Sequence, residues 1–149
     1  MSNLRSRVKF GESAWSWDFL NGNCFGAHDV RIGDIDGFGE QHDHLLLIEA
    51  KPTGYRWRPG NAQRRAHKVF ARRPGQVCLV LYGDSPEAPT VTEAQANCLG
   101  TFDDLIPTSN DSVIEWVRRW FEHARSGCDA SACTWAVPVA SVAGLEATA

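Results

Sequence analysis

The sequence predicts a mixed α/β domain in which helices flank a central β-sheet. Its 149 residues are 43% hydrophobic and 22% charged, which is the length and balance of one globular domain with a single core. Segments with strand and helix patterns follow in the order strand, strand, helix, strand, helix, an order typical of this class. We expect the domain to cover residues 1–125. Residues 126–149 are expected to be either a loosely ordered tail or a short final strand around residues 134–139.

The first part of the chain predicts a β-hairpin. Aromatic residues and glycines crowd into residues 11–26, which indicates a short helix or turn followed by a loop. Strands are expected at residues 29–39 and 44–51, and the polar residues 40–43 form the turn between them. Residues 45–48 are continuously apolar, as expected for a strand that is covered on both faces.

The second part alternates helices and strands. A helix is expected over residues 62–73, capped by Asn61 and ended by a Pro-Gly pair. Residues 76–82 predict a buried strand, residues 90–99 are ambiguous, and residues 112–125 predict an amphipathic helix. The aromatic side chains of this last helix either join the core or form a dimer face, so a homodimer is one expected state.

Charge is distributed unevenly along the chain. The formal net charge is −3, but residues 51–73 contain eight Lys or Arg and no Asp or Glu, so the rest of the chain carries −11. This basic block suits a polyanionic partner such as nucleic acid, and a solvated basic face is the alternative. The block consists of Lys51, Arg56, Arg58, Arg64, Arg65, Lys68, Arg72 and Arg73.

The cysteine content and the hydropathy pattern indicate a cytoplasmic protein. The five cysteines form no C-x-x-C pair, and their odd number disfavours a closed disulfide framework. The first ten residues lack the apolar stretch of a signal peptide, and no apolar run approaches the roughly 18 residues of a membrane span. We therefore expect no membrane partner.

The expected hairpin brings acidic residues and a lysine together. In an antiparallel hairpin, the residue numbers of two directly opposed residues always add up to the same value. For a turn centred between residues 42 and 43, this value is 85. Asp36 then faces Glu49, Asp34 faces Lys51, and all four side chains project from the same side of the sheet. Two opposed carboxylates can hold a divalent cation, with the backbone carbonyl of Ala50 as a further ligand. The alternative is that Lys51 neutralises one acid while the others reach solvent.

These residues resemble the signature of the PD-(D/E)XK nuclease superfamily. Residues 33–37 read GDIDG, and the apolar strand that follows ends in EAK at residues 49–51, the Glu-x-Lys of that signature. Residues 17–26 read WDFLNGNCFG, a pattern similar to small phage-encoded or prophage-encoded proteins of this group. The resemblance covers roughly residues 13–85. It implies a restriction-endonuclease-like fold and, for a phage protein, the host cytoplasm.

The resemblance also implies a metal-dependent centre. In that family the second acid of the Asp pair and the Glu of Glu-x-Lys usually bind Mg²⁺ or Mn²⁺, and these positions correspond to Asp36 and Glu49. Asp34 is then a candidate for a further metal ligand, as is Glu12 on the first helix with Asp18 as its substitute, and Lys51 corresponds to the family's lysine.

Gln63 is similar in placement to a glutamine that some members of the family use beside the metal or the attacking water. The family pattern often has a glycine directly before this glutamine, whereas two residues separate Gln63 from Gly60 in this chain.

The implied reaction is hydrolysis of a phosphodiester bond in nucleic acid, with DNA as the expected substrate. The cation polarises the phosphate and activates a water, and Lys51 helps to position or deprotonate that water. Tyr55 and Trp57 can stack on an unpaired base, although packing within their own loop is the favoured expectation. The residues expected to hold the nucleic-acid backbone are Arg56, Arg58, Arg64, Arg65, Lys68 and Arg72.

Two other functions fit the sequence. A nucleic-acid-binding module with a degenerate nuclease fold would keep the basic block and lose the metal. A phage-type protein that binds and inhibits a host factor would use the aromatic residues near Trp15 and Trp17 as its contact surface.

A zinc site is not expected. His28 and Cys24 lie near the acidic residues, but the ligand spacings of structural zinc are absent. The segment His42-Asp43-His44 is expected to be a solvated turn.

Overall fold

A computed structural model describes residues 18–27, 35–85 and 87–142 of the chain. The chain divides into two compact units, Met1–Asp34 and Ile35–Ala149. In the first unit the described residues form the short helix α2 (Asp18–Asn21) and a turn in which the Asn23 side chain donates to the Phe19 carbonyl at 2.7 Å. This agrees with the expected short helix followed by a loop. Trp15, Trp17 and His28 lie outside the described residues.

The second unit is an α/β fold built on a mixed sheet of six strands, in the order β1-β2-β3-β4-β5 with β6 paired to β4. The pair β2 and β3 is parallel and the other pairs are antiparallel, so α3 forms the crossover between β2 and β3. The mixed α/β class is therefore confirmed. The strands and main helices are β1 (Gly37–Gln41), β2 (His44–Pro52), α3 (Ala62–Arg72), β3 (Gln76–Asp84), β4 (Thr90–Cys98), β5 (Thr101–Phe102), β6 (Ile106–Pro107) and α4 (Asn110–Arg125).

The hairpin of β1 and β2 has the register that the sequence predicts. Gly37 pairs with Ile48 and Gln41 with His44, so position numbers of opposed residues sum to 85. The two turn residues, His42 and Asp43, have φ angles of 47° and 67°, the left-handed conformation of a tight hairpin turn. The ladder begins only at Gly37, and the part of the expected strand over residues 29–34 lies outside the described residues.

The expected solvated turn holds for only two of its three residues. His42 and Asp43 are exposed, but His44 is only 2% exposed, so the prediction of a solvated His44 is wrong. The cause is the period of a strand: His44 begins β2 and points to the same face as Leu46, which lies in the core.

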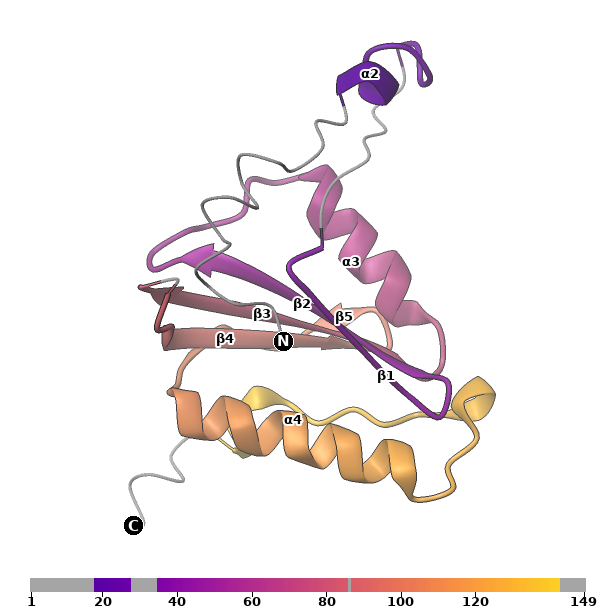
Figure 1. Cartoon of the computed structure of the whole chain (residues 1–149), viewed down its shortest axis with the longest axis vertical. Coiled ribbons are helices and arrows are strands. Elements are labelled where there is room, and N and C mark those ends of the chain that lie inside the picture. The colour runs from indigo at the N-terminus through magenta and orange to yellow at the C-terminus, as the bar shows by residue number, and fades with distance from the viewer. Residues whose placement is uncertain (1–17, 28–34, 86, 143–149) are drawn as a thin grey trace. The chain divides into compact units, whose positions relative to one another are not determined.

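Helices cover both faces of the sheet, with α3 on one side and α4 on the other (Figure 1). Beneath α4 the core contains the even-numbered Leu46 of β2 together with Leu79 and Trp116. Beneath α3 a second cluster contains the odd-numbered Leu47 and Tyr82. Side chains of β2 thus alternate between two apolar layers, which confirms that this strand is covered on both faces.

The remaining elements follow the sequence closely. Asn61 caps α3, because its side-chain oxygen accepts from the Arg64 backbone N–H at 3.1 Å. The ambiguous segment over residues 90–99 forms β4. Trp116 and Trp120 are 0% and 6% exposed and belong to the core. In the part of the chain that the structure describes, no helix is both long and apolar enough to cross a membrane.

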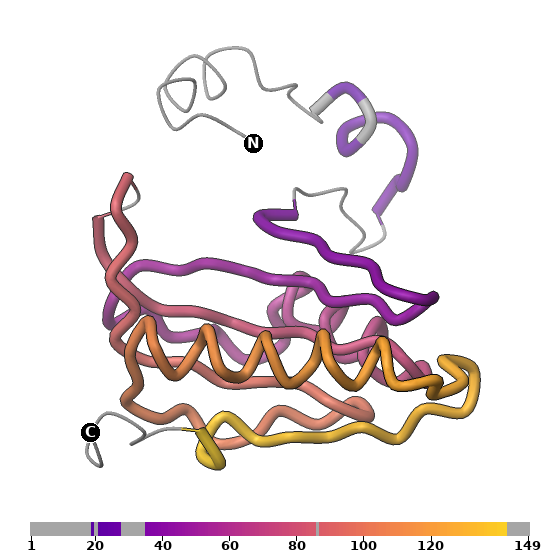
Figure 2. The backbone as a smooth tube through the Cα atoms, turned by 60° about the horizontal axis from the view of Figure 1, so that its bottom comes forward, coloured from indigo at the N-terminus to yellow at the C-terminus, as the bar shows by residue number. Residues whose placement is uncertain are grey.

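Residues 126–142 form neither a loose tail nor the expected short strand. They contain two short 3₁₀ helices, η1 (Ala130–Ala132) and η2 (Val139–Ser141), and run back beside α4 (Figure 2). Val139 and Val142 are 1% and 0% exposed and complete the core beneath α4. Trp116 also donates its indole N–H to the Val137 carbonyl at 2.8 Å. Buried apolar contacts therefore hold this segment in the fold.

The packing of Val139 predicts a loss of stability on truncation. Val139→Ala removes two buried methyl groups and leaves a cavity, so we expect the free energy of unfolding to fall by roughly 1–3 kcal/mol in urea titrations. Ala140→Ser changes an exposed neighbour and is the control, with an expected change within about 0.5 kcal/mol. Equal stability of the two variants would contradict the core position of Val139.

Candidate active site

Three of the residues singled out by the sequence meet on the α3 side of β2. Glu49 is 4% exposed, and its Oε1 atom lies 3.1 Å from Lys51 Nζ. Lys51 Nζ also donates to Gln63 Oε1, at 3.1 Å, from the first turn of α3. Glu49 and Lys51 project to the same side because they are two residues apart on one strand. An ion pair and a hydrogen bond thus join Glu49, Lys51 and Gln63.

Asp36 reaches the same place from the chain just before β1. It is exposed, and its Oδ2 atom accepts a hydrogen bond from the Ala50 backbone N–H at 2.9 Å. The sequence predicts that Asp36 faces Glu49 as a paired strand residue. The β1–β2 ladder begins only at Gly37, so Asp36 contacts β2 through its side chain instead. This contact anchors the Asp36 carboxylate beside the residue that follows Glu49.

The electrostatics of the site centre on Glu49. Burial raises the pKa of the Glu49 carboxyl, and the nearby negative charge of Asp36 raises this pKa further. The hydrogen bond and positive charge of Lys51 act in the opposite direction, as does hydrogen bonding by Gln63. Two acids thus share a partly desolvated site with a single lysine between Glu49 and Gln63.

The other expected metal ligands are not all placed. Asp34 and Glu12 lie outside the described residues. Ala50 is exposed, and its N–H is used by Asp36, so the role of its carbonyl stays a prediction.

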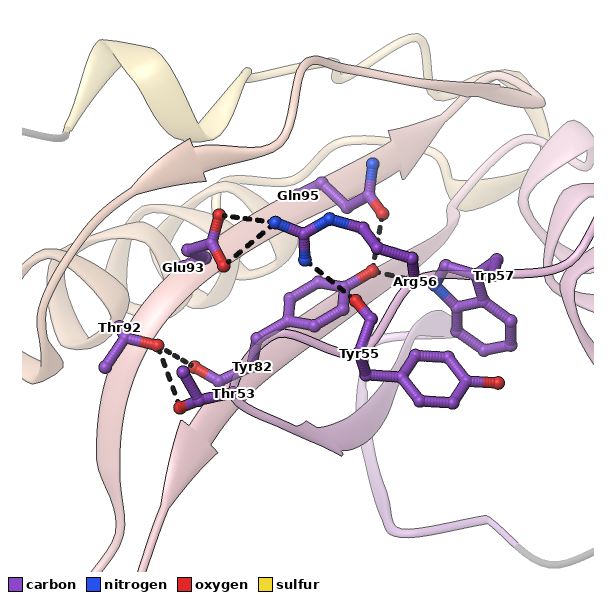
Figure 3. A network of polar contacts seen from close by, with 8 residues as sticks. All are labelled: Thr53, Tyr55, Arg56, Trp57, Tyr82, Thr92, Glu93 and Gln95. Carbon is purple, nitrogen blue, oxygen red and sulfur yellow. Dashed lines mark hydrogen bonds and ion pairs between the residues drawn. The ribbon is translucent and has the colours of Figure 1, made fainter.

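The loop after β2 packs its aromatic rings over Lys51. The Nζ atom of Lys51 lies 5.0 Å from the Tyr55 ring centroid and 4.8 Å from that of Trp57. Trp57 donates its indole N–H to the Tyr82 hydroxyl at 2.7 Å, and Tyr82 donates to Gln95 at 2.8 Å (Figure 3). The Tyr55 and Trp57 rings also pack edge-on against each other at a centroid distance of 5.3 Å, as expected for packing within their loop, and together they cover Lys51.

Polar contacts to β4 fix the same loop. Arg56 lies 3.4 Å from a carboxylate oxygen of Glu93, and the hydroxyls of Thr53 and Thr92 are 3.2 Å apart (Figure 3). The exposed Arg56 pair contributes little energy by itself. Together the contacts orient the loop across the end of the sheet.

The basic residues divide into two sets. Arg64 turns toward the sheet, where its guanidinium lies 3.8 Å from the Phe102 ring centroid and donates to Gln95 at 3.2 Å. The remaining predicted nucleic-acid contacts are exposed. Three of them follow each other at helical spacing along α3, so they share one surface of that helix. The exposed residues are Arg56, Arg58, Arg65, Lys68 and Arg72.

His67 is a member of the site that the sequence analysis did not single out. It is 4% exposed, and its ring packs edge-on against Trp57 at a centroid distance of 5.7 Å. Burial lowers the His67 pKa to about 4, and the positive charges of Lys51 and Arg64 contribute. The sequence contains one indication of this position: His67 follows Gln63 by four residues, so the two side chains lie on the same face of α3.

Searches of protein-family models, curated proteins and solved structures returned no match to this chain.

The His67 environment predicts a pH dependence of stability. The unfolded-state pKa of histidine is about 6.5, so at pH values below this the unfolded chain binds a proton that folded His67, with a pKa of about 4, does not. The stability contributed by neutral His67 is thus present above pH 6.5 and is lost as the pH falls toward 4. Its charged neighbours are Lys51, Arg64 and Asp36.

We therefore expect the wild-type protein to lose about 2 kcal/mol more than His67→Gln when urea unfolding is compared at pH 7.5 and pH 5. His42→Gln, in the exposed turn, is the matched control and should keep the wild-type dependence. Parallel pH profiles for the wild type and His67→Gln would show that His67 is not held neutral.

Proposed function

We propose that this chain is a metal-dependent nuclease of the PD-(D/E)XK type, with DNA as its substrate. The observation that carries the proposal is the buried Glu49 carboxylate, which is joined to Lys51 and Gln63 and lies close enough to Asp36 for their charges to interact. A folded domain rarely places a buried carboxylate beside a second acid without a cation or a chemical task.

The topology supports a restriction-endonuclease-like fold. Asp36 precedes the first strand of a hairpin, the Glu-x-Lys segment lies on its second strand, and α3 then crosses to the parallel strand β3. This order brings together Asp36 from the segment before β1, Glu49 and Lys51 from β2, and Gln63 from α3. The order of these elements along the chain is therefore compatible with the resemblance of the motifs to the PD-(D/E)XK signature.

The donor set fits Mg²⁺ or Mn²⁺. Carboxylate oxygens are the hard ligands that these ions prefer, and a cation between Asp36 and Glu49 would relieve the repulsion that raises the Glu49 pKa. Such an ion, when bound, polarises a phosphodiester and makes a water more acidic. The ligands from the described residues would be Asp36, Glu49 and the Ala50 carbonyl.

Lys51 and Gln63 supply the remaining chemistry. The Lys51 ammonium would stabilise the negative charge that develops on a phosphate bound beside Glu49, and it could donate a hydrogen bond to that phosphate. Gln63 is a positioning residue, because its Oε1 atom accepts from Lys51 and holds the ammonium beside Glu49. The rings of Tyr55 and Trp57 limit the movement of the lysine.

The basic surface supports a nucleic-acid substrate. Lys68 and Arg72 are exposed on α3, the helix that also contributes Gln63, so a phosphate backbone along α3 would lead to the site. Arg64 would stabilise the inner side of α3 beneath this surface, because it contacts Gln95 and Phe102 of the sheet.

Loss of the central charges should abolish cleavage. We expect Glu49→Gln and Lys51→Met each to reduce the cleavage rate by at least about 100-fold, because Glu49 would hold the cation and Lys51 would stabilise negative charge on the phosphate. Gln63→Ala should lower kcat by about 10- to 100-fold with a smaller change in KM. The assay uses single-stranded, double-stranded and branched DNA, and RNA, with Mg²⁺, Mn²⁺ or chelator.

Glu122→Gln, on the exposed side of α4, is the matched control and should retain full activity. Cleavage that survives both Glu49→Gln and Lys51→Met would contradict the proposed centre. Tight binding of DNA by the wild-type chain without cleavage under every condition would instead favour a degenerate binding module.

Removal of exposed charges from α3 should weaken DNA binding uniformly across sequences. For Lys68→Ala combined with Arg72→Ala we expect the slope of log Kd against log salt to fall by about 2, since two phosphate contacts are lost. Binding is measured in chelator, where no cleavage occurs. Arg118→Ala combined with Arg125→Ala removes the same charge from α4 and should leave the slope unchanged; an equal effect of both pairs would exclude a specific role for α3.

A further inference from the structure

A second cluster of reactive side chains lies at the opposite end of β2 from Lys51. His44 begins β2, His123 lies in the last turn of α4, and Cys128 and Cys133 stand on either side of η1. One ligand atom from each of the four residues lies within 4.8 Å of those of the other three. The cluster belongs to the α4 side of the sheet, whereas Glu49 faces α3.

His44 has an unpartnered nitrogen in a buried position. Its side chain is 2% exposed, and its Nδ1 atom lies 2.9 Å from the His42 carbonyl oxygen. Because a carbonyl only accepts, Nδ1 carries the hydrogen, and the Nε2 atom of the neutral ring keeps its lone pair. Nε2 is buried and has no hydrogen-bond partner. A histidine bound to metal commonly has this arrangement, with one ring N–H donated to a carbonyl and the other nitrogen on the ion.

The sulfur of Cys133 lies beside His123 in a buried setting. Cys133 is 5% exposed, and its Sγ atom is 3.4 Å from His123 Nε2. The Trp135 backbone N–H also points at this sulfur, at 3.4 Å. An N–H donor stabilises negative charge on sulfur, and it is the kind of contact that supports a metal-bound thiolate.

The turn at η1 brings Cys128 close to Cys133 and the two histidines. The Asp129 carboxylate caps η1 by accepting from the Ser131 N–H at 2.9 Å, so the chain turns sharply between the two cysteines. η1 itself packs against Gly75, where an added Cβ would lie 2.7 Å from the Ala130 carbonyl oxygen. The position of this turn is therefore fixed by the body of the fold.

The separations suit a tetrahedral ion. Zn–S bonds of about 2.3 Å and Zn–N bonds of about 2.0–2.1 Å place neighbouring ligand atoms roughly 3.3–3.8 Å apart. The observed sulfur-to-nitrogen distance of 3.4 Å lies in this range, and the outer limit of 4.8 Å requires only small side-chain rotations. Two thiolates and two neutral imidazoles also give Zn²⁺ no net charge, which suits a largely buried site.

We infer that His44, His123, Cys128 and Cys133 form a structural zinc site. All four positions of the tetrahedron are filled by the protein, so the site is closed and has no position for substrate. It joins the start of β2 to the end of α4 and to the segment over residues 126–142, which carries the buried Val139 and Val142. The site is independent of the proposed nuclease activity, because it uses a different face and the other end of β2.

The test uses the full-length chain, freed of metal by chelator under reducing conditions, and Zn²⁺ or Co²⁺ as the probe. We expect one ion per chain, a Co²⁺ complex with the absorption bands of tetrahedral thiolate coordination, and a higher Tm with Zn²⁺. Cys133→Ser and His44→Gln should each weaken Zn²⁺ binding by more than about 100-fold. Cys24→Ser, at an exposed cysteine of the first unit, is the matched control and should bind as the wild type does, as should Glu49→Gln.

X-ray absorption at the zinc edge of the wild-type complex gives a result that does not depend on the folding of any variant. The expected first shell contains two sulfur and two nitrogen atoms. A shell of oxygen and nitrogen alone, or binding that persists when Cys128 and Cys133 are both replaced by Ser, would overturn the proposal.

Discussion

Glu49 is 4% exposed within a β-sheet, so the charge of its carboxylate must be compensated, and this compensation comes from Lys51 at 3.1 Å. Much of the surrounding structure maintains this pair. Gln63 holds the ammonium from α3, and the rings of Tyr55 and Trp57 cover it from the loop. The loop is held in turn by Tyr82 and β4, so the ion pair depends on the crossover helix and the centre of the sheet together.

The sequence was sufficient for β1, β2 and β3 and for the central part of the candidate site, but not for β4, whose pattern is ambiguous, or for the short strands β5 and β6. Hairpin register followed from the position of a short polar turn, and strand alternation then placed Glu49 and Lys51 on one face. These are local rules, since each depends on residues close together in the chain. The contact of Lys51 with Gln63 confirms that the two lie together, although the residues before Gln63 depart from the family pattern.

Features that depend on contacts between distant segments could not be predicted. The inward turn of Arg64 depends on Gln95 and Phe102, which no local pattern connects to α3. The cluster of His44, His123 and the two cysteines has no signature along the chain for the same reason, because His44 comes from the hairpin and the other three ligands from the end of α4 and the segment after it. Residues 126–142 have few charged groups and no clear period, yet burial of Val139 and Val142 makes them part of the core. On this account β2 carries two different polar sites, one near each end.

A crystal structure of the wild-type chain soaked in Mn²⁺ tests the central claim most directly, because the anomalous signal of manganese locates the ion without reference to activity. The account predicts a peak between the carboxylates of Asp36 and Glu49, within about 2–2.5 Å of an oxygen from each. Ordered Glu49 and Lys51 side chains with no manganese between Asp36 and Glu49, at concentrations that fill other sites, would contradict it.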